Sequence, residues 1–464
     1  MFNSMLFVLI IYFFILIFIG LITSLKKNQN SFISGENSLN FFVAAISVNV
    51  SDMGAWLFLG LPSAIYTTGL TKLWTPLTLI TFMFLNWHIV APKIKIASQK
   101  YNIKTMLGFL EHSCSNKNIR IIGALWCFLF LIVYISVGIY GIGIICESLF
   151  NVNYKLGCFL GISTTFIYIS LGGFLAVAWS NCLQGIFLLI VIFIVPFFFT
   201  LKNQFIFPDL FFYTNNIFNI PIIEIIIIIF IWGLGYFGQP HILNKFTAIK
   251  NINDIKKAKI VSLMWQLIVL FASSSIGMIA LWSLSNIKDT KTIFAIMVSN
   301  IFFPFVGAII MCAVLSAIIS TLDAQILSLS SILTEDIYNR FFINYFKIKI
   351  IIISRISIFF IASIAFIISI YPIESIYNTV ECCWIGLGGV FAPIILLAKE
   401  KEIININSMI IGMFMNGIIT IYIYFFNENP YFLVNNLLIT NKIFLLVGFS
   451  LYLLIISFSI KKVY

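Results

Sequence analysis

Long apolar segments, separated by short polar ones, run through this sequence from end to end. A helix that crosses a bilayer needs about 20 mostly apolar residues. Segments of that kind cover residues 4–24, 40–68, 73–91, 121–148, 155–175, 183–201, 221–242, 260–283, 303–331, 351–371, 377–398, 405–426 and 440–460. Only 9% of the 464 residues are charged, against roughly 25% in soluble domains. The sequence therefore predicts an all-α polytopic membrane protein with about 13 transmembrane helices.

The placement of the basic residues sets the expected orientation. The formal charge of +11 comes from 27 Lys and Arg, a balance also found in nucleic-acid-binding proteins. Here the basic residues gather in alternate connections, as the positive-inside rule describes for cytoplasmic loops. With the N-terminus outside and the C-terminus in the cytoplasm, only six fall outside: Lys72, Lys155, Lys202, Lys288, Lys291 and Lys442. We therefore expect the charge to reflect topology, with no nucleic-acid partner.

The first chemically unusual segment lies inside the second apolar run, at residues 49–62. It holds the carboxylate of Asp52 and the helix-interrupting residues Gly54, Gly60 and Pro62. A charge at bilayer depth costs at least roughly 2.5 kcal/mol, so such residues usually serve function. Backbone groups freed by a break are tolerated only where they face a cavity or protein. The segment favours a broken helix that offers oxygen atoms to an ion. A kinked packing helix with Asp52 bonded to a neighbour is the competing interpretation.

A second interrupted segment, residues 232–241, lies in the seventh apolar run. It contains Gly233, Gly235, Gly238 and Pro240. Because the second and seventh runs are five apart, they cross the membrane in opposite senses. Interruptions at corresponding positions of two inverted halves point to a transporter's binding site, and two unrelated packing kinks are the alternative. The organisation we expect is a single transmembrane domain (1–464) made of a peripheral helix (1–30), two repeats (38–201 and 218–398) and two last helices (403–464).

A polar helix face is predicted in the ninth apolar run. Ala317, Ser320 and Thr321 are spaced i, i+3 and i+4, which places them on one side of a helix. Two hydroxyl groups there can complete an oxygen shell begun by freed carbonyl groups of the second run. Packing contacts between helices are the alternative use of Ser and Thr in membranes, but the interrupted second run favours the ion site.

The sequence lacks the patterns typical of an enzyme. Its eight cysteines form no CxxC pair, its three histidines lie near the membrane faces, and no metal-ligand spacing or nucleophile triad is found. We therefore expect neither an enzyme nor any cofactor besides a coupling ion.

These segments closely resemble the sodium/solute symporter family and, within it, the branch of bacterial proline carriers. The similarity runs over roughly residues 30–400. It is carried by Ser51-Asp52-Met53, Trp56-Leu57, Gly60-Leu61-Pro62, Gly172-Gly173-Phe174-Leu175-Ala176-Val177, the run 232–243, Ser320-Thr321-Leu322 and Ile332-Leu333-Thr334-Glu335-Asp336. The resemblance implies a LeuT-like 5+5 inverted repeat with discontinuous helices 2 and 7.

The resemblance also implies roles for single residues. Sodium is expected on the backbone carbonyls of Val50, Met53 and Ala317 and on the hydroxyls of Ser320 and Thr321. Asp52 matches the family's essential carboxylate, whose charge favours a nearby cation. The substrate residues implied are Trp56, Gly60, Tyr134, Trp232 and Tyr236. An aromatic packing stripe is the alternative interpretation of the ring-bearing members of that set.

Four positions depart from the proline carriers. Gly54 replaces a serine, Asn181 replaces an aspartate and Glu381 replaces a serine; Glu36-Asn37-Ser38 stands in place of Gly-Arg-Ser. Glu381 is also a carboxylate at membrane depth, either hydrogen-bonded and neutral or accessible to protons. These differences are expected to affect the affinity for the ion, the strength of coupling and the identity of the transported solute.

The expected function is sodium-coupled import of L-proline across a bacterial inner membrane by alternating access. The expected partners are L-proline, the sodium ion and the lipid bilayer, with no obligate protein partner. The same mechanism with another small solute, such as pantothenate or a different carboxylate, is the alternative. A channel or a membrane sensor is a second and more distant class.

Overall fold

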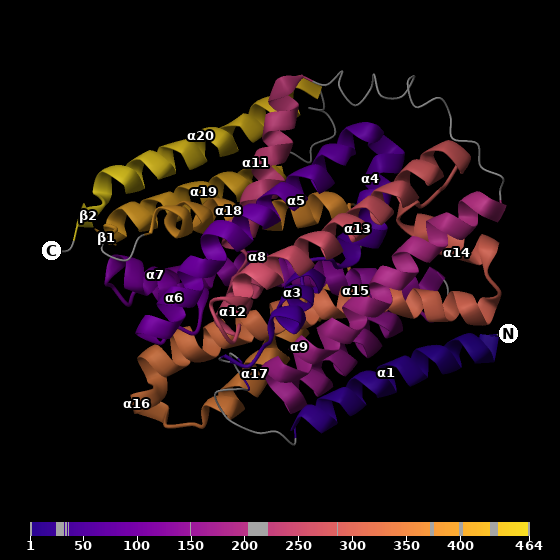
Figure 1. Cartoon of the computed structure of the whole chain (residues 1–464), viewed down its shortest axis with the longest axis horizontal. Helices are drawn as coiled ribbons and strands as arrows, with labels where there is room; N and C mark the ends of the chain where they lie inside the picture. Colours follow the sequence, from indigo (N-terminus) through magenta and orange to yellow (C-terminus); the bar gives the residue numbers. More distant parts are fainter. Residues whose placement is uncertain are drawn as a thin grey trace.

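The computed structural model describes residues 2–24, 32, 35, 37–148, 150–202, 221–284, 286–371, 375–398, 402–426 and 435–462. Over these ranges the regular structure is helical apart from one two-residue antiparallel strand pair, so the predicted all-α fold is confirmed. In chain order (Figure 1) the elements are α1 (Phe2–Ser24), α3 (Phe41–Val50), η1 (Trp56–Gly60), α4 (Leu61–Thr68), η2 (Leu70–Leu73), α5 (Trp74–Leu85), η3 (Asn86–Val90), α6 (Ala91–Tyr101), α7 (Met106–Cys114), α8 (Ile119–Ser148), α9 (Tyr154–Lys202), α11 (Ile222–Gly238), α12 (Pro240–Thr247), α13 (Asp254–Ser283), η4 (Thr290–Thr292), α14 (Ile293–Ile301), α15 (Pro304–Ser331), η5 (Ile332–Phe342), α16 (Ile343–Phe346), α17 (Ile350–Ser369), α18 (Ile376–Leu397), β1 (Glu402–Ile403), α19 (Ile406–Phe426), α20 (Asn435–Ser459) and β2 (Lys461–Lys462).

Helix α15, which carries the predicted hydroxyl face, lies inside the bundle. It packs against α8, α9 and α17, and every residue from 310 to 331 is buried. Burial on all sides is typical of a helix that is apolar all round. The hydroxyl, amide and carboxylate groups on α15 must therefore meet other helices or an internal cavity.

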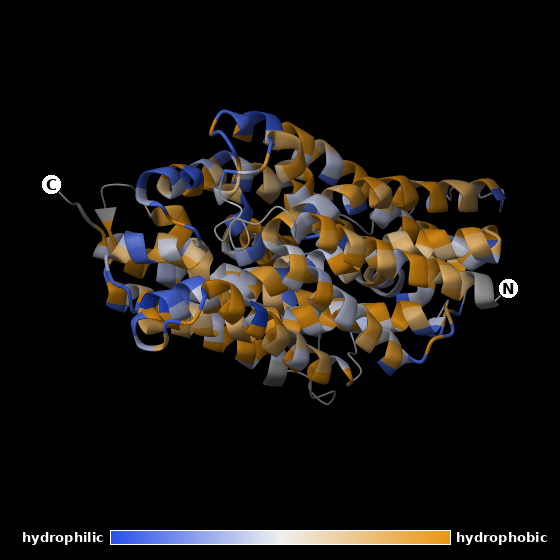
Figure 2. Cartoon of the chain, turned by 90° about the horizontal axis from the view of Figure 1, so that it is seen from below, coloured by the Kyte–Doolittle hydropathy of each residue, from blue (hydrophilic) through white to orange (hydrophobic). Residues whose placement is uncertain are grey.

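The outside of the bundle is apolar, as a lipid-facing surface requires. Figure 2 shows hydrophobic residues along the helices, with hydrophilic residues gathered in connecting segments, most of them toward the end marked C. On α1 the side chains of Phe7, Phe14 and Phe18 are each more than 60% exposed. Helix α1 begins at the opposite end of the long axis from β2 (Figure 1).

Nine described helices are long and apolar enough to cross a membrane, or ten if the bent pair α11 and α12 forms one span. The chain is thus a multi-pass membrane protein. The sequence predicts thirteen spans, and the difference has structural causes. The run 40–68 is divided into α3, η1 and α4. The runs 155–175 and 183–201 both lie within α9, where the non-helical torsion angles of Gly173 (φ 60°, ψ −146°) mark a kink between two helices.

Two further predicted runs also correspond to helices of the structure. The run 221–242 is bent by 43° between α11 and α12. The run 440–460 lies mostly within α20 (Asn435–Ser459), a helix of 25 residues.

Candidate ion and substrate site

The first break separates α3 from η1. The N–H of Gly54 donates to the carbonyl of Asp52, two residues back, at 3.1 Å, whereas an α-helical N–H donates to the carbonyl four residues back. The helix resumes as η1, which is π-helical, and continues as α4. The interruption predicted for the second span is present, and it leaves the Val50 carbonyl for partners outside its own helix.

The Val50 carbonyl meets the hydroxyl face of α15. The hydroxyls of Ser320 and Thr321 donate to it at 3.3 and 3.2 Å. The same hydroxyls lie 2.7 and 3.3 Å from the carbonyl oxygen of Ala317. Four of the five predicted ligand residues thus place oxygen atoms in one buried cluster, which we call the oxygen cluster. Such oxygens are the ligand type that hard cations prefer.

Met53, the fifth predicted ligand, lies in the unwound segment. It is fully buried, and its N–H donates to the carbonyl of Asn49 at 3.2 Å. Its neighbour Gly54 lies directly against Thr321: a Cβ atom on Gly54 would be 2.9 Å from Thr321 Oγ1 and 3.0 Å from Thr321 Cβ. The serine of the proline carriers would force Thr321 to shift in this conformation, so glycine is what allows the close approach.

Asp52 is fully buried in the same unwound segment. The hydroxyl of Tyr236 donates to its Oδ2 at 2.6 Å, and Nε2 of Gln266 donates to that hydroxyl oxygen at 2.7 Å. Within the described ranges Oδ1 accepts no hydrogen bond. One carboxylate therefore joins the first break to α11 and, through Tyr236, to α13. Asp52 does bond to a neighbour, but the helix around it is broken and not merely kinked.

The second break falls between α11 and α12, which confirms the predicted interruption. Gln239 is extended (φ −81°, ψ 110°) and Pro240 starts α12, as expected for a residue that precedes proline. The preceding glycines remain helical and pack closely instead. A Cβ atom on Gly235 would lie 1.9 Å from the Trp384 ring, and one on Gly238 would lie 2.3 Å from a backbone carbonyl of α18.

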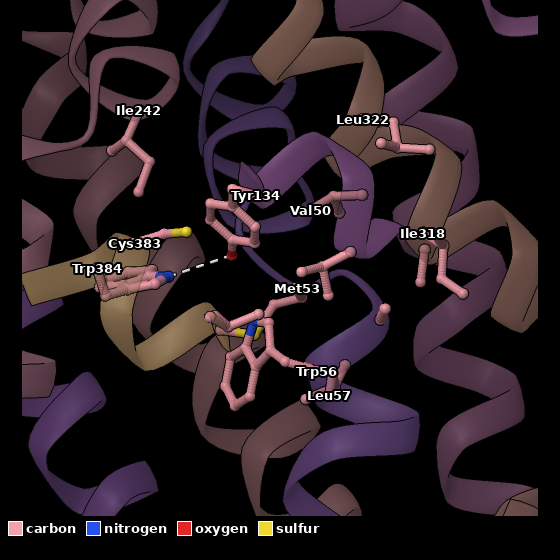
Figure 3. Close-up of a cluster of buried hydrophobic side chains, with 14 of the residues drawn as sticks. Val50, Met53, Trp56, Leu57, Tyr134, Ile242, Ile318, Leu322, Cys383 and Trp384 are labelled. Carbon is pink, nitrogen blue, oxygen red and sulfur yellow. Dashed lines mark hydrogen bonds between the residues drawn. The ribbon is translucent and has the colours of Figure 1, made fainter. Parts of the chain in front are cut away.

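Four of the five predicted substrate residues meet in one aromatic cluster. The ring of Trp232 lies 5.5 Å from that of Trp56 and 6.0 Å from that of Trp384. Tyr236 contacts Trp384 edge-on at 5.0 Å. Nε1 of Trp384 donates to the hydroxyl of Tyr134 at 3.1 Å, the dashed line in Figure 3. Trp56 and Tyr134 also line an internal cavity that reaches Thr321 of the oxygen cluster.

Gly60, the fifth predicted substrate residue, ends η1 and faces α18. A Cβ atom there would lie 3.3 Å from Trp56 Cβ and 3.4 Å from Ile376 Cγ2. Its small size allows η1 to lie beside α18 next to Trp56.

Sequence reasoning missed three residues at this site. Trp384 and Tyr377 lie on α18, seven residues and so about two turns apart, and the Tyr377 ring lies 5.0 Å from that of Trp232 at a tilt of 47°. That aromatic spacing on one helix face was a usable signal. The third residue, Gln266, gave no signal, because its contact with Tyr236 depends on how α13 packs.

The remaining departures from the proline carriers lie around the site. With its amide turned to satisfy both ends, Asn181 donates to the Val177 carbonyl at 3.0 Å and accepts from Nζ of Lys245 at 3.1 Å. Oε2 of Glu381 accepts a hydrogen bond from the hydroxyl of Tyr424 at 2.9 Å. Oδ1 of Asn37 accepts from Lys95 at 2.5 Å, whereas Glu36 lies outside the described residues.

Comparison with known proteins gives matches over most of the chain. The model of the sodium:solute symporter family matches residues 32–419. Sodium/proline symporter 2 of Staphylococcus saprophyticus is 32% identical over 434 residues, which cover 89% of this chain and 84% of that protein. The high-affinity proline transporter PutP of Bacillus subtilis is 32% identical over 390 residues, which cover 80% of this chain and 82% of that protein.

A solved structure matches the whole architecture. A Na+-coupled sialic acid symporter in a substrate-bound outward-open state has a TM-score of 0.77, with 99% of each chain covered and 15% identity. A likeness at that identity shows the fold alone, and it bears out the expected LeuT-like architecture.

Proposed function

This chain belongs to the sodium:solute symporter family, and we propose that it imports L-proline together with sodium by alternating access. As a member of that family it is a transporter and not an enzyme. The two relatives at 32% identity are a sodium/proline symporter and a proline transporter, which supports proline as the solute. The observation that carries the proposal is the oxygen cluster, which lies where the break in the second span meets α15.

In this proposal sodium takes the centre of the oxygen cluster. The carbonyls of Val50, Met53 and Ala317 and the hydroxyls of Ser320 and Thr321 are its ligands. The hydroxyl hydrogens now directed at the Val50 and Ala317 carbonyls turn outward when the cation enters. The charge of Asp52 favours the cation without contacting it, because buried charges interact strongly over short distances.

Proline lies beside the cation, in the aromatic cluster. Trp56, Tyr134, Trp232 and Tyr236 offer apolar walls to the pyrrolidine ring, and Gly60 leaves room next to Trp56. The carboxylate binds the N–H groups at the start of η1, since a helix N-terminus attracts anions. No bond of the solute changes during transport.

Coupling between the two ligands follows from their shared wall. Thr321 is both an oxygen-cluster residue and a wall of the cavity that Trp56 and Tyr134 line. Sodium fixes the unwound segment against α15, and that segment leads into the N–H groups that hold the solute. Each ligand therefore raises the affinity for the other, as linkage requires.

We place the N-terminus outside and the C-terminus in the cytoplasm of a bacterial inner membrane, with one transmembrane domain over 1–464. The distribution of Lys and Arg supports this orientation. A fluorescent reporter that folds only in the cytoplasm, fused after residue 464, is expected to fluoresce. A fusion protein that is expressed at a normal level but does not fluoresce would show the opposite orientation.

The decisive experiment is uptake of radiolabelled proline into proteoliposomes that contain the purified full-length chain. We expect saturable uptake that an inward sodium gradient stimulates and an equal potassium gradient does not. Saturable sodium-driven uptake of pantothenate or another carboxylate, with none of proline, would support the alternative solute. Non-saturable flux would indicate a channel.

A further inference from the structure

Gln325 on α15 has a buried side-chain amide that makes no hydrogen bond to any described residue. Its side chain is fully buried, and neither Oε1 nor Nε2 has a hydrogen-bond partner among the described residues. Buried polar groups in native proteins are nearly always paired, since an unpaired one costs about 1–3 kcal/mol. A buried amide without a protein partner inside a membrane helix suggests a partner that binds reversibly, such as a transported ligand.

The position of Gln325 identifies where that partner binds. Gln325 lines the same internal cavity as Trp56, Tyr134 and Thr321. It follows Thr321 by four residues on α15, so the two side chains lie on one helix face, one turn apart. The amide therefore faces the proposed solute cavity one turn from the oxygen cluster. Apart from Thr321, the other residues that line the cavity are aromatic, aliphatic or glycine.

We propose that the Gln325 side chain binds the solute directly and that its Oε1 accepts a hydrogen bond from the solute's charged amine. This inference rests on the proposed function. A zwitterion brings an anionic and a cationic group into the cavity, and the N–H groups at the start of η1 suit the anionic one. The cationic group needs an acceptor, which a carboxamide oxygen provides. The hydroxyl oxygen of Tyr134 already accepts from Trp384 at 3.1 Å.

Gln184 on α9 provides a matched control. It is also buried, but its Nε2 donates to the hydroxyl of Tyr12 at 3.3 Å, on the side of α9 that packs against α1. Methionine has nearly the shape of glutamine, and it is flexible enough to fill the same space. Gln325→Met and Gln184→Met thus remove the same amide from two buried places, of which only one faces the cavity.

The test measures sodium-driven proline uptake in proteoliposomes, with cyclopentanecarboxylate as a competitor that has the ring and the carboxylate but no amine. In the wild type we expect proline to bind far more tightly than the analogue. Gln325→Met should raise the KM for proline at least about tenfold, the loss of one hydrogen bond to a charged group. The inhibition constant of the analogue should change less than threefold. Gln184→Met should leave both values unchanged.

A second measurement separates binding from folding. Because Gln325→Met removes an unpaired buried amide, the ligand-free variant should unfold in detergent at the same or a higher temperature than the wild type. The rise in melting temperature caused by sodium alone should persist, while the further rise caused by proline is lost.

The outcomes distinguish the inference from the proposed function. A Gln325→Met variant with unchanged KM, or one weakened equally toward proline and the analogue, would overturn the inference and leave proline transport standing. A wild-type chain that takes up no proline would contradict the proposed function, and the inference would fall with it.

Discussion

Single hydroxyl groups on α15 are where the proposed ion site is most easily tested. Thr321→Ala removes one oxygen of the five while keeping the helix. We expect the sodium concentration that gives half-maximal proline uptake to rise at least about tenfold, because a ligand to a charged ion is lost. Initial rates of uptake at varied sodium measure this. Ser316→Ala is the control, since its hydroxyl donates to the Cys312 carbonyl of its own helix at 2.9 Å and does not belong to the oxygen cluster. An equal effect of Ser316→Ala would contradict a special role of Thr321.

Asp52 allows charge and hydrogen bonding to be separated. Asp52→Asn keeps an oxygen that accepts from Tyr236, but it removes the negative charge that favours the cation. Tyr236→Phe removes the hydrogen bond of 2.6 Å and keeps the charge. We therefore expect Asp52→Asn to abolish sodium-stimulated uptake and Tyr236→Phe only to reduce it. The measurement is proline uptake by each variant with and without a sodium gradient. Wild-type rates in Asp52→Asn would contradict the role that we assign to the charge of Asp52.

The three oxygen-cluster residues of α15 could be predicted from sequence because local spacing carries the information, whereas Val50 was implied by the family resemblance. The i, i+3, i+4 pattern of Ala317, Ser320 and Thr321 survives in any helix. The bond between Asp52 and Tyr236 joins residues 184 positions apart, and no local pattern encodes such a contact. Gln325 was visible in the sequence, but its lack of a partner exists only in the packed structure.

Between elements, proline and glycine have different effects, although the sequence presents them together. In the second interrupted segment the break occurs at Gln239, directly before Pro240, because proline restricts the residue before it. The glycines of α11 stay helical, and they allow the backbone of α18 to approach. The existence of the break was predictable. Its position and the packing role of the glycines were not, since both depend on α18.

The close contact of α11 with α18 makes a prediction for stability. A Cβ atom on Gly388 would lie 2.8 Å from the carbonyl carbon and oxygen of Leu234 and 2.9 Å from the backbone nitrogen of Gly235. These are backbone atoms that cannot turn aside, and overpacking of this kind costs about 1–3 kcal/mol. Gly388→Ala should therefore lower the melting temperature in detergent and reduce uptake.

Gly307 on α15 is the control for that substitution. A Cβ atom there would meet only Val298 Cγ1, at 3.3 Å, and alanine favours a helix more than glycine does. Gly307→Ala should leave the melting temperature unchanged or raise it. Equal destabilisation by both substitutions would show that helix α18 is not specially close to α11.

For the whole molecule, the sequence predicts the fold class more directly than it predicts the bounds of the spans. Apolar length and the sparse charge suffice for a multi-pass bundle, because they reflect transfer into lipid and not packing. The bounds of the spans depend on how helices break: α9 contains a kink between two helices at Gly173, and the second span is divided. Those outcomes are set by neighbouring helices.

Coupling belongs to the assembled molecule, since it requires the first break, α15 and the aromatic cluster together. If saturating sodium raises the affinity for proline by some factor, saturating proline must raise the affinity for sodium by the same factor. We expect a factor of roughly 5–150, measured by equilibrium binding of labelled proline at varied sodium and of labelled sodium at varied proline. In Thr321→Ala both factors should fall toward one together, because Thr321 borders both sites. Unequal factors in the wild type would contradict a site that binds one sodium ion with one solute molecule.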